Sequence, residues 1–394
     1  MVRELVITMY LFVFQILFTV FNLFPQKKKT VFVASFGDNI LFTLKELEKH
    51  TDDQVVILTN SQCKIDFGQI SIGKELKFEF PHLMSWLQSI YHLATADKVF
   101  VDNYFGFLAV TNFKSNVQCI QLWHAAGAVK QFGLKDPSIN DRSSRANERF
   151  NSVYQRFTHV VVGSEKMAAI FRESFGLSNN AILRTGVPRT DFFYDTIKMR
   201  EVELQLKLKF PVLNRKKVIL YAPTYRDDQL DHAKIALDIQ TLESHLSDEY
   251  VLFLKLHPAI KGQFNSSNSN FVYDVSGMSD LNELLVVTDI LISDYSSIPF
   301  EFSLLERPMI FFAYDQEEYE KASGFWENYE NLVPGPVVRN TDEIIGVLSD
   351  YKFEMKDVRS FAQQWNQYSQ GNASERLIAS LYREEEQLRA VDQQ

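Results

Sequence analysis

The hydrophobic and polar positions of this 394-residue chain divide it into an apolar N-terminal stretch and a longer region of alternating strand-like and helix-like patterns. Residues 5–24 contain no charged side chain, and about twenty such residues are long enough to cross a bilayer as a helix. The polar residues in and beside this stretch fall within a narrow stripe at about 100° per residue, which is typical of a helix in a membrane interface. They are Glu4, Thr8, Gln15, Thr19, Asn22 and Gln26.

Three lysines, Lys27, Lys28 and Lys29, follow this stretch directly. In one interpretation the helix spans the membrane with the lysines inside, by the positive-inside rule. In the other it lies in the interface, with its polar stripe toward water and the lysines on anionic headgroups. The stripe favours the second interpretation. A cleaved signal peptide is disfavoured because no small-residue cleavage site follows, and a buried helix of a soluble domain is the remaining alternative. Both membrane interpretations predict a protein at the cytoplasmic face of the cell membrane, held peripherally or by this one helix.

From residue 30 onward, short apolar runs alternate with amphipathic helical patterns, which predicts parallel sheets covered by helices. The expected strands are 31–34, 55–58, 99–101, 117–122, 160–162, 218–221, 251–254, 290–292 and 309–312.

We therefore predict an α/β fold with two Rossmann-type parallel-sheet domains that face a cleft, since ligands of such sheets bind outside the carboxyl ends of the strands. The predicted segments are a membrane-associated helix with a basic flank (1–29), an N-terminal domain (30–200), a linker (201–217), a C-terminal domain (218–350) and a helical tail (351–394).

Composition narrows the functional classes. The chain is 46% hydrophobic and 23% charged, which is typical of a globular protein. Its net charge of −9 argues against a general nucleic-acid binder. Two cysteines, Cys63 and Cys119, are too few for a disulfide framework or a zinc site. Neither a Walker A sequence nor G-x-G-x-x-G is present, and no H-E-x-x-H or Cys/His cluster indicates a metal.

A histidine follows the expected strand 117–122. His124 is succeeded by small residues, among them Gly127, and small residues let backbone N–H groups approach a ligand closely. A histidine at this place can act as a general base at neutral pH. The alternative is a structural histidine that caps a helix.

An arginine ends the turn Gly186-Val187-Pro188-Arg189. Its planar guanidinium could bind a phosphate with two parallel hydrogen bonds. The alternative is an ion pair with Asp191 or Asp195.

Two further motifs end expected strands in the second half of the chain. Pro223, Thr224 and Arg226 offer a hydroxyl and a guanidinium together after one strand. Lys255 and His257 end the next strand, and alternation sends their side chains to the same side. A cation and an imidazole there suit an anionic leaving group, and a solvated surface lysine is the alternative.

The stretch 289–307 reads as strand, tight turn and helix, with a proline in the first helical turn, where its missing N–H is tolerated. The hydroxyls of Ser296 and Ser297 and the free N–H groups of the helix start suit a phosphate, although Ser-Ser before Pro is also an ordinary cap. Asp280, after Ser279, is predicted to cap a helix. Glu301 could accept hydrogen bonds from a sugar hydroxyl.

In its motifs WHAAGAVKQFG, YAPTYRDD, KLHP and TDILISDYSSIPFEFSLLERPMIFFAYDQEEY, the chain resembles the CDP-glycerol glycerophosphotransferase family of wall teichoic acid synthesis. The resemblance implies a GT-B-like fold whose C-terminal domain holds most of the nucleotide. It also implies an enzyme at the cytosolic membrane face with CDP-glycerol as donor and an undecaprenyl-linked disaccharide as acceptor. Neither a cofactor nor a metal is implied.

The resemblance also assigns roles to residues. His124 matches the histidine proposed as general base, His257 matches a second histidine thought to support the donor pyrophosphate, and Arg189 fits a phosphate contact. The positions that match segments around the CDP moiety are Pro223, Thr224, Lys255, Ser279, Asp280, Ser296 and Ser297.

Where polymerases of the family usually have WHG-T-P, this chain has Trp-His-Ala-Ala-Gly-Ala, which favours a primase that adds the first glycerol phosphate. The alternatives are a glycerol- or ribitol-phosphate polymerase, a nucleotide-sugar glycosyltransferase and a non-catalytic membrane-bound subunit. The oligomeric state stays open, and an oligomer is compatible with the sequence.

Overall fold

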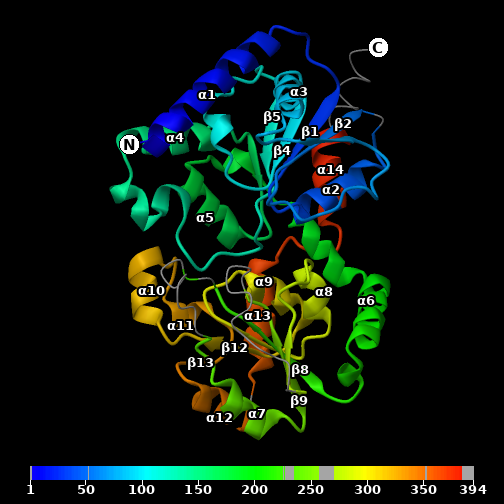
Figure 1. Cartoon of the computed structure of the whole chain (residues 1–394), viewed down its shortest axis with the longest axis vertical. Coiled ribbons are helices and arrows are strands. Elements are labelled where there is room, and N and C mark those ends of the chain that lie inside the picture. The colour runs from blue at the N-terminus through cyan, green and yellow to red at the C-terminus, as the bar shows by residue number, and fades with distance from the viewer. Residues whose placement is uncertain are drawn as a thin grey trace. The chain divides into compact units, whose positions relative to one another are not determined.

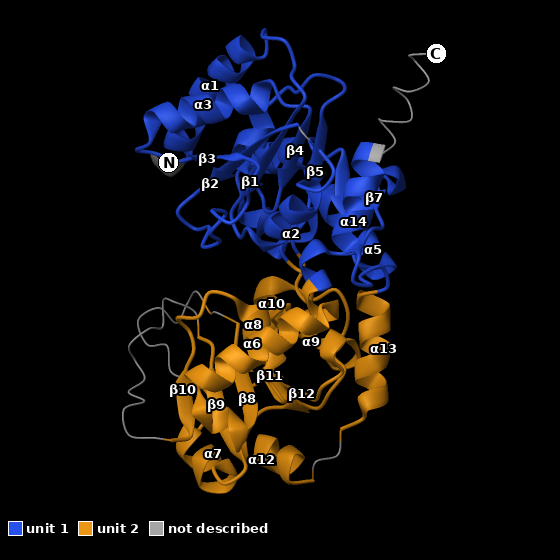
Figure 2. Ribbon diagram, turned by 90° about the vertical axis from the view of Figure 1, so that its right-hand side faces the viewer, with its two compact units in different colours: residues 1–124, 132–191, 367–394 blue, residues 125–131, 192–366 orange. Residues whose placement is uncertain are grey.

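The computed structural model describes residues 2–51, 53–224, 226, 235–256, 270–350 and 353–383. The chain forms two compact units (Figure 2). Unit 1 comprises residues 1–124, 132–191 and 367–394, and unit 2 comprises residues 125–131 and 192–366. Neither unit is one continuous stretch, because the chain passes between them four times, after His124, Gln131, Asp191 and Asn366.

Unit 1 is built on a parallel sheet of seven strands in the order β3-β2-β1-β4-β5-β6-β7 (Figure 1). The order reverses between β1 and β4, and ligands of such sheets bind beside this switch point at the carboxyl ends. The strands are β1 Lys29–Ala34, β2 Gln54–Thr59, β3 Lys74–Lys77, β4 Lys98–Val101, β5 Gln118–Gln121, β6 His159–Val161 and β7 Ile182–Leu183.

Helices cover the strands of unit 1, and every residue of β1 is buried as a result. The helices are α1 Val2–Phe21, α2 Asp38–Leu47, α3 Leu83–Ala94, α4 Ser144–Tyr154, α5 Glu165–Phe175 and α14 Ala373–Ile378, with the 3-10 turn η1 Gly106–Val110. Side chains of α2 and α14 share one hydrophobic core with alternate residues of the central strands.

Unit 2 repeats this design with six parallel strands in the order β10-β9-β8-β11-β12-β13, which reverses between β8 and β11. The strands are β8 Lys217–Ala222, β9 Tyr250–Leu254, β10 Val272–Asp274, β11 Ile290–Ser293, β12 Met309–Phe312 and β13 Val337–Val338. The helices are α6 Thr196–Lys209, α7 Ile239–Leu246, α8 Leu281–Val286, α9 Ile298–Phe302, α10 Gln316–Ser323, α11 Tyr329–Leu332, α12 Thr341–Asp350 and α13 Met355–Trp365.

Two parallel sheets with helices confirm the predicted α/β class, and the structure adds the short strands β3, β7, β10 and β13. The units also differ from the predicted segments. Helix α6, expected mostly in the linker, belongs to unit 2 and packs against α8. Residues 367–383, expected in the tail, belong to unit 1, because Leu377 and Ile378 of α14 enter its core.

Helix α1 packs along unit 1 against α3 and η1. Phe14 and Phe18 on its inner face are buried, while the opposite face is apolar and exposed. By length and composition alone, α1 is also apolar enough to cross a membrane. The exposed side chains, between 47% and 62% accessible, are Leu5, Val6, Met9, Phe12, Val13, Ile16 and Val20. Thr8, Gln15 and Thr19 of the polar stripe are exposed as well.

Candidate active-site residues at the strand ends

A buried carboxylate fixes the loop at the switch point of unit 1. Asp102 directly follows β4 and is 1% exposed. Its carboxylate accepts the backbone N–H groups of Ser35 (2.9 Å), Phe36 (3.0 Å) and Gly37 (2.7 Å), which follow β1. Burial raises the pKa of Asp102 to about 6, although the three N–H donors act in the opposite direction. The carboxylate therefore gives the β1 loop one defined conformation.

His124 lies between two aromatic rings in this region. Its ring centroid is 4.2 Å from that of Phe36 and 4.4 Å from that of Trp123, both in stacked orientation. Its Nδ1 is 3.2 Å from the carbonyl oxygen of Asp102. Because a carbonyl can only accept, this contact assigns the proton to Nδ1 and leaves a lone pair on Nε2.

The electrostatic surroundings keep this imidazole neutral. Burial, with a smaller contribution from the positive charge of Arg189, lowers the pKa of His124 to about 4, although the hydrogen bond to the Asp102 carbonyl acts in the opposite direction. At pH 7 the ring is therefore unprotonated at Nε2 and able to accept a proton.

The backbone before His124 is in an unusual conformation. Trp123 has φ +58°, which is rare for a bulky residue and costs about 1–3 kcal/mol. Its indole stacks on Phe132 with centroids 4.9 Å apart, and the Trp123 backbone N–H donates to the Gln121 side-chain oxygen at 2.8 Å. These contacts hold the strained residue in place and so orient the neighbouring His124.

Asn39 connects the His124 loop to the turn that carries Arg189. Its side-chain amide donates to the Trp123 carbonyl at 2.9 Å, and its oxygen accepts the Arg189 backbone N–H at 3.0 Å. The Arg189 guanidinium lies 3.8 Å from the Asp38 carboxylate. The structure therefore brings His124 and Arg189 together, as expected of two residues of one site.

Unit 2 fixes its own switch point in the same way. Asp294 directly follows β11, is 1% exposed, and accepts the backbone N–H of Thr224 at 2.8 Å and its hydroxyl at 2.7 Å. Thr224 follows β8, as Ser35 follows β1. Pro223, Thr224, Ser296 and Ser297 remain partly exposed on loops next to this carboxylate. The structure thus gathers these four predicted residues at one edge of the sheet.

Arg226 is buried beside the same carboxylate. It donates to Asp294 at 2.8 Å and to Asp315 at 2.9 and 3.0 Å. Its guanidinium also lies 4.8 Å from the ring centroid of Tyr319 and 5.2 Å from that of Tyr295. These contacts identify a structural role for Arg226, and its role toward substrate stays a prediction.

Lys255 holds the neighbouring loop. Its ammonium donates to the carbonyl oxygens of Ser276 (3.4 Å) and Met278. Two residues later, Asp280 accepts the N–H groups of Asn282 and Glu283 at the start of α8, so the predicted helix cap is confirmed. Ser279 lies between these anchors. His257 lies outside the described residues.

The helix α9 that follows Ser297 starts as predicted, with Pro299 in its first turn and the Ser296 hydroxyl accepting the Ile298 N–H at 3.2 Å. Gly127 packs directly on this helix, because a Cβ there would lie 2.1 Å from the Phe300 ring. Glu301 is only 2% exposed. The substrate contacts expected of Gly127 and Glu301 stay predictions.

Among the residues that the structure describes, no group of three or more His, Cys, Asp or Glu side chains could hold a metal ion. The sequence motifs do not single out Asp102, Asp294, Asn39 or Trp123 as site residues. Both aspartates directly follow a strand, which is the same pattern that predicts the other site residues.

Two doubly wound parallel sheets, each with a buried carboxylate that fixes a polar loop at its switch point, define a two-domain α/β protein of the GT-B-like class. The chain belongs to the CDP-glycerol:poly(glycerophosphate) glycerophosphotransferase family, whose match covers residues 16–383. The family resemblance is thereby confirmed, and similarity to teichoic acid enzymes confirms the assignment to teichoic acid biosynthesis.

The chain is similar to the teichoic acid glycerol-phosphate primase of Bacillus spizizenii, with 37% identity over 88% of this chain and 90% of the relative. It is 33% identical to the teichoic acid poly(ribitol-phosphate) polymerase of the same organism, over 93% of this chain and 58% of that one. Its fold is similar to the solved wall teichoic acid polymerase TagF, with a TM-score of 0.80, 23% identity and coverage of 98% and 99%.

Proposed function

We propose that this protein is a teichoic acid primase, which transfers glycerol phosphate from CDP-glycerol to a hydroxyl of an undecaprenyl-diphosphate-linked disaccharide and releases CMP. The observation that carries the proposal is the environment of His124: a neutral imidazole whose Nδ1 faces a carbonyl and whose Nε2 has a lone pair. Membership of the glycerophosphotransferase family supports the donor, and 37% identity to a glycerol-phosphate primase supports the product.

In the proposed reaction, Nε2 of His124 accepts the proton of the acceptor hydroxyl. The resulting oxygen attacks the phosphorus that carries glycerol, the bond from this phosphorus to the bridging oxygen breaks, and CMP leaves with that oxygen. A pKa of about 4 makes His124 a weak base in the free protein. The negative charge of the bound diphosphate favours the imidazolium and therefore raises this pKa as the reaction begins.

The rest of the proposed site supplies position and positive potential, which dominate catalysis of phosphoryl transfer. Arg189 would contact a donor phosphate, since the Asn39 hydrogen bond holds its backbone beside His124. Thr224, Ser296 and Ser297, with the segments held by Lys255 and Asp280, would contact the CDP moiety. His257 is proposed to support the pyrophosphate on the family resemblance.

A second candidate is a polymerase of the same family, which the 33% identity to a poly(ribitol-phosphate) polymerase favours. Incubation with CDP-glycerol and the lipid-linked disaccharide, read by product mass, separates the two. A product with one added unit supports the primase, and a ladder supports a polymerase. CMP release with CDP-ribitol but not with CDP-glycerol would show that CDP-ribitol is the donor. The absence of transfer from either donor would overturn both proposals.

We also propose that the protein works at the cytosolic membrane surface and that α1 lies in the interface. The exposed apolar face of α1 supports this proposal, because the opposite face already packs on α3 and η1. Flotation of the full chain with vesicles of anionic lipid tests it, and a protein that stays in the soluble fraction would contradict it.

A further inference from the structure

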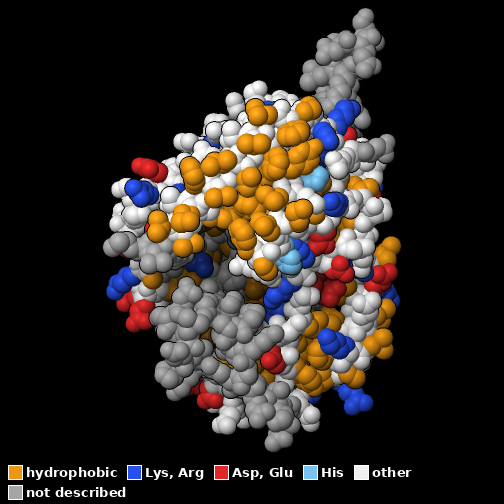
Figure 3. Space-filling view, turned by 45° about the horizontal axis from the view of Figure 1, so that its top comes forward, with side chains coloured by type: hydrophobic (Ala, Val, Ile, Leu, Met, Phe, Trp, Pro, Cys, Tyr) orange, Lys and Arg blue, Asp and Glu red, His pale blue; other side chains and the backbone are white. Residues whose placement is uncertain are grey.

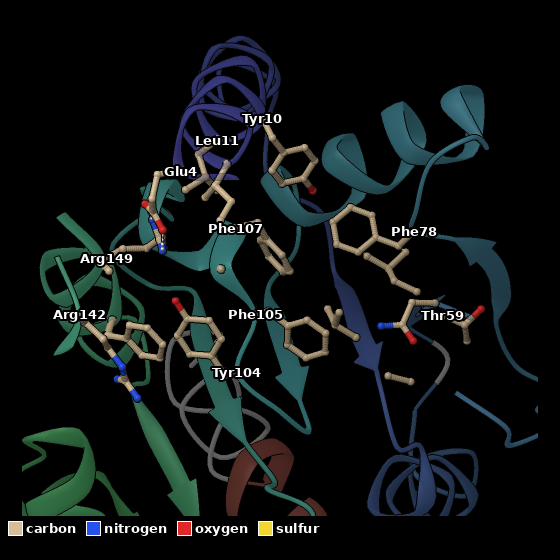
Figure 4. A pocket seen from close by; sticks show the side chains of 18 residues that line it. Glu4, Tyr10, Leu11, Thr59, Phe78, Tyr104, Phe105, Phe107, Arg142 and Arg149 are labelled. Carbon is tan, nitrogen blue, oxygen red and sulfur yellow. Dashed lines mark hydrogen bonds and ion pairs between the residues drawn. The ribbon is translucent and has the colours of Figure 1, made fainter. Parts of the chain in front are cut away.

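A cavity of about 590 Å³ lies in unit 1, between α1, the carboxyl ends of β1 and β2, η1 and α4 (Figure 4). This volume is within the ~300–1,000 Å³ range of sites that bind small ligands. Six of its lining side chains are aromatic, and these rings come from segments far apart in the chain. They are Tyr10, Phe78, Tyr104, Phe105, Phe107 and Phe150.

Charged groups gather at one end of this cavity. The guanidinium of Arg149, on α4, is paired with the Glu4 carboxylate of α1 at 3.2 and 3.4 Å. Arg142 donates to Asp136 at 2.6 Å through Nη2, whereas its Nη1 is buried without a hydrogen-bond partner. A buried donor without an acceptor is rare in folded proteins and calls for an oxygen-bearing ligand. The charged lining therefore favours an anion.

The cavity adjoins the groups that position His124. Val33 and Ala34 at the end of β1 line it, and the loop held by Asp102 begins at the next residue, Ser35. Tyr104, two residues after Asp102, lines it from the loop that follows β4. A ligand that fills the cavity is thus next to the ends of β1 and β4, and the loops that follow these strands contact the proposed base.

The outer surface of the helix that roofs the cavity is apolar. Tyr10 and Leu11 of α1 face inward (Figure 4), whereas Leu5, Met9 and Phe12 are exposed on its other side. Figure 3 shows hydrophobic side chains gathered over the upper face of the molecule, where α1 and α3 lie. An amphiphile in the cavity would therefore have an apolar protein surface immediately outside it.

We infer that this cavity binds the phosphate-bearing end of the lipid-linked acceptor, with the first part of its hydrocarbon chain against the aromatic rings and its diphosphate on Arg142 and Arg149. The inference rests on the proposed function. Arginine suits a phosphate because its planar fork offers two parallel donors. Burial of hydrocarbon against the rings adds affinity in proportion to the apolar area removed from water. The bound diphosphate would compete with Glu4 for Arg149.

Gly106 offers a way to fill the cavity without disturbing its wall. This residue lines the cavity, and a Cβ added to it would meet only Tyr104 Cε1, at 4.0 Å. Gly106→Leu should therefore occupy ligand space while the fold is kept. Gly346→Leu is the matched control, because position 346 is exposed in α12 of unit 2 and a Cβ there meets nothing within 4 Å.

The test measures binding of farnesyl diphosphate, short-chain phosphatidylglycerol and inorganic diphosphate to the full-length protein by calorimetry. We expect the wild type and Gly346→Leu to bind farnesyl diphosphate, and Gly106→Leu to bind it at least ~10-fold more weakly. Arg142→Gln provides a second variant with the same expectation. Unchanged affinity in both variants, or tighter binding of phosphatidylglycerol than of farnesyl diphosphate, would overturn the inference.

The same samples test the proposed function separately. CDP-glycerol should raise the melting temperature of the wild type and of Gly106→Leu equally, because the cavity is not the donor site. Absence of this shift in every sample would contradict the donor assignment, while the farnesyl diphosphate titration would still decide the role of the cavity.

Discussion

Replacement of His124 is the most direct test of the proposed chemistry. The structure gives this imidazole a pKa of about 4, against 6.5 for an ordinary histidine, and a lone pair on Nε2. Loss of a general base slows a reaction ~10²- to 10⁴-fold, which is about 2.7–5.4 kcal/mol of transition-state stabilisation. We expect His124→Gln to lose at least ~10²-fold in kcat, while the thermal shift with CDP-glycerol is retained.

The pH dependence of the wild-type rate follows from the same geometry. For the free protein, kcat/KM should fall only as the pH approaches about 4, because the base is neutral above this value. In the donor complex, the acidic limb of kcat should lie at higher pH, since the diphosphate favours the imidazolium. CMP release across pH 4–8 provides both profiles. A His124→Gln variant with the wild-type rate would refute the reasoning, as would an acidic limb of kcat/KM near pH 6.5.

Stability offers an independent measure of the buried imidazole. Its folded pKa lies below its unfolded value, so the folded state binds fewer protons. The contribution of His124 to the free energy of unfolding is therefore fully present above pH 6.5. It decreases by about 3 kcal/mol as the pH falls to about 4. His124→Gln should abolish this component in urea unfolding at pH 7 and pH 4.

His92 provides the matched control for that experiment. It is buried in α3, and burial together with the charges of Lys29, Lys74 and Lys27 also lowers its pKa to about 4. His92→Gln should therefore reduce the acid-dependent loss of stability as His124→Gln does, but leave CMP release unchanged. Equal loss of activity in both variants would show that the effect on rate comes from folding.

Three further predictions concern the scaffold and the membrane. Asp294→Ala should cost about 1–3 kcal/mol in urea unfolding, because Arg226 keeps Asp315 as a partner but the Thr224 N–H and one Arg226 N–H lose their acceptor. Gly127→Ala should lower stability by about 1–3 kcal/mol and the melting temperature with it, because its Cβ would overlap the Phe300 ring. Phe12→Glu should reduce the fraction of protein that floats with anionic vesicles, since it places a charge on the exposed apolar face of α1.

Two of these variants have a control in the same chain. Gly346→Ala should leave the melting temperature unchanged or slightly higher, because its Cβ meets nothing and alanine favours a helix. Gln15→Glu, on the exposed polar stripe of α1, should reduce flotation less than Phe12→Glu. An Asp294→Ala variant that loses less than about 1 kcal/mol of free energy of unfolding would contradict the stabilising role assigned to this carboxylate.

Site residues that directly follow a strand are the ones that the sequence predicts best. His124, Thr224 and Lys255 were identified because each follows an apolar run, and such runs become buried strands wherever helices cover both faces of a sheet. Asp102 follows a strand in the same way, yet a lone aspartate after a strand looks like a solvated carboxylate. Its three backbone donors come from residues more than sixty positions earlier, a pairing that no local pattern encodes.

Local periodicity and contiguous motifs are enough to predict the α/β class, the apolar N-terminal helix and the family from the amino-acid sequence. The folded chain was needed to show which residues share a unit, the partners of Asp102 and Asp294, the burial of Arg226 and Glu301, and the cavity under α1. The physical reason is that burial and hydrogen bonding depend on groups far apart in the chain, and these meet only when the sheets have formed.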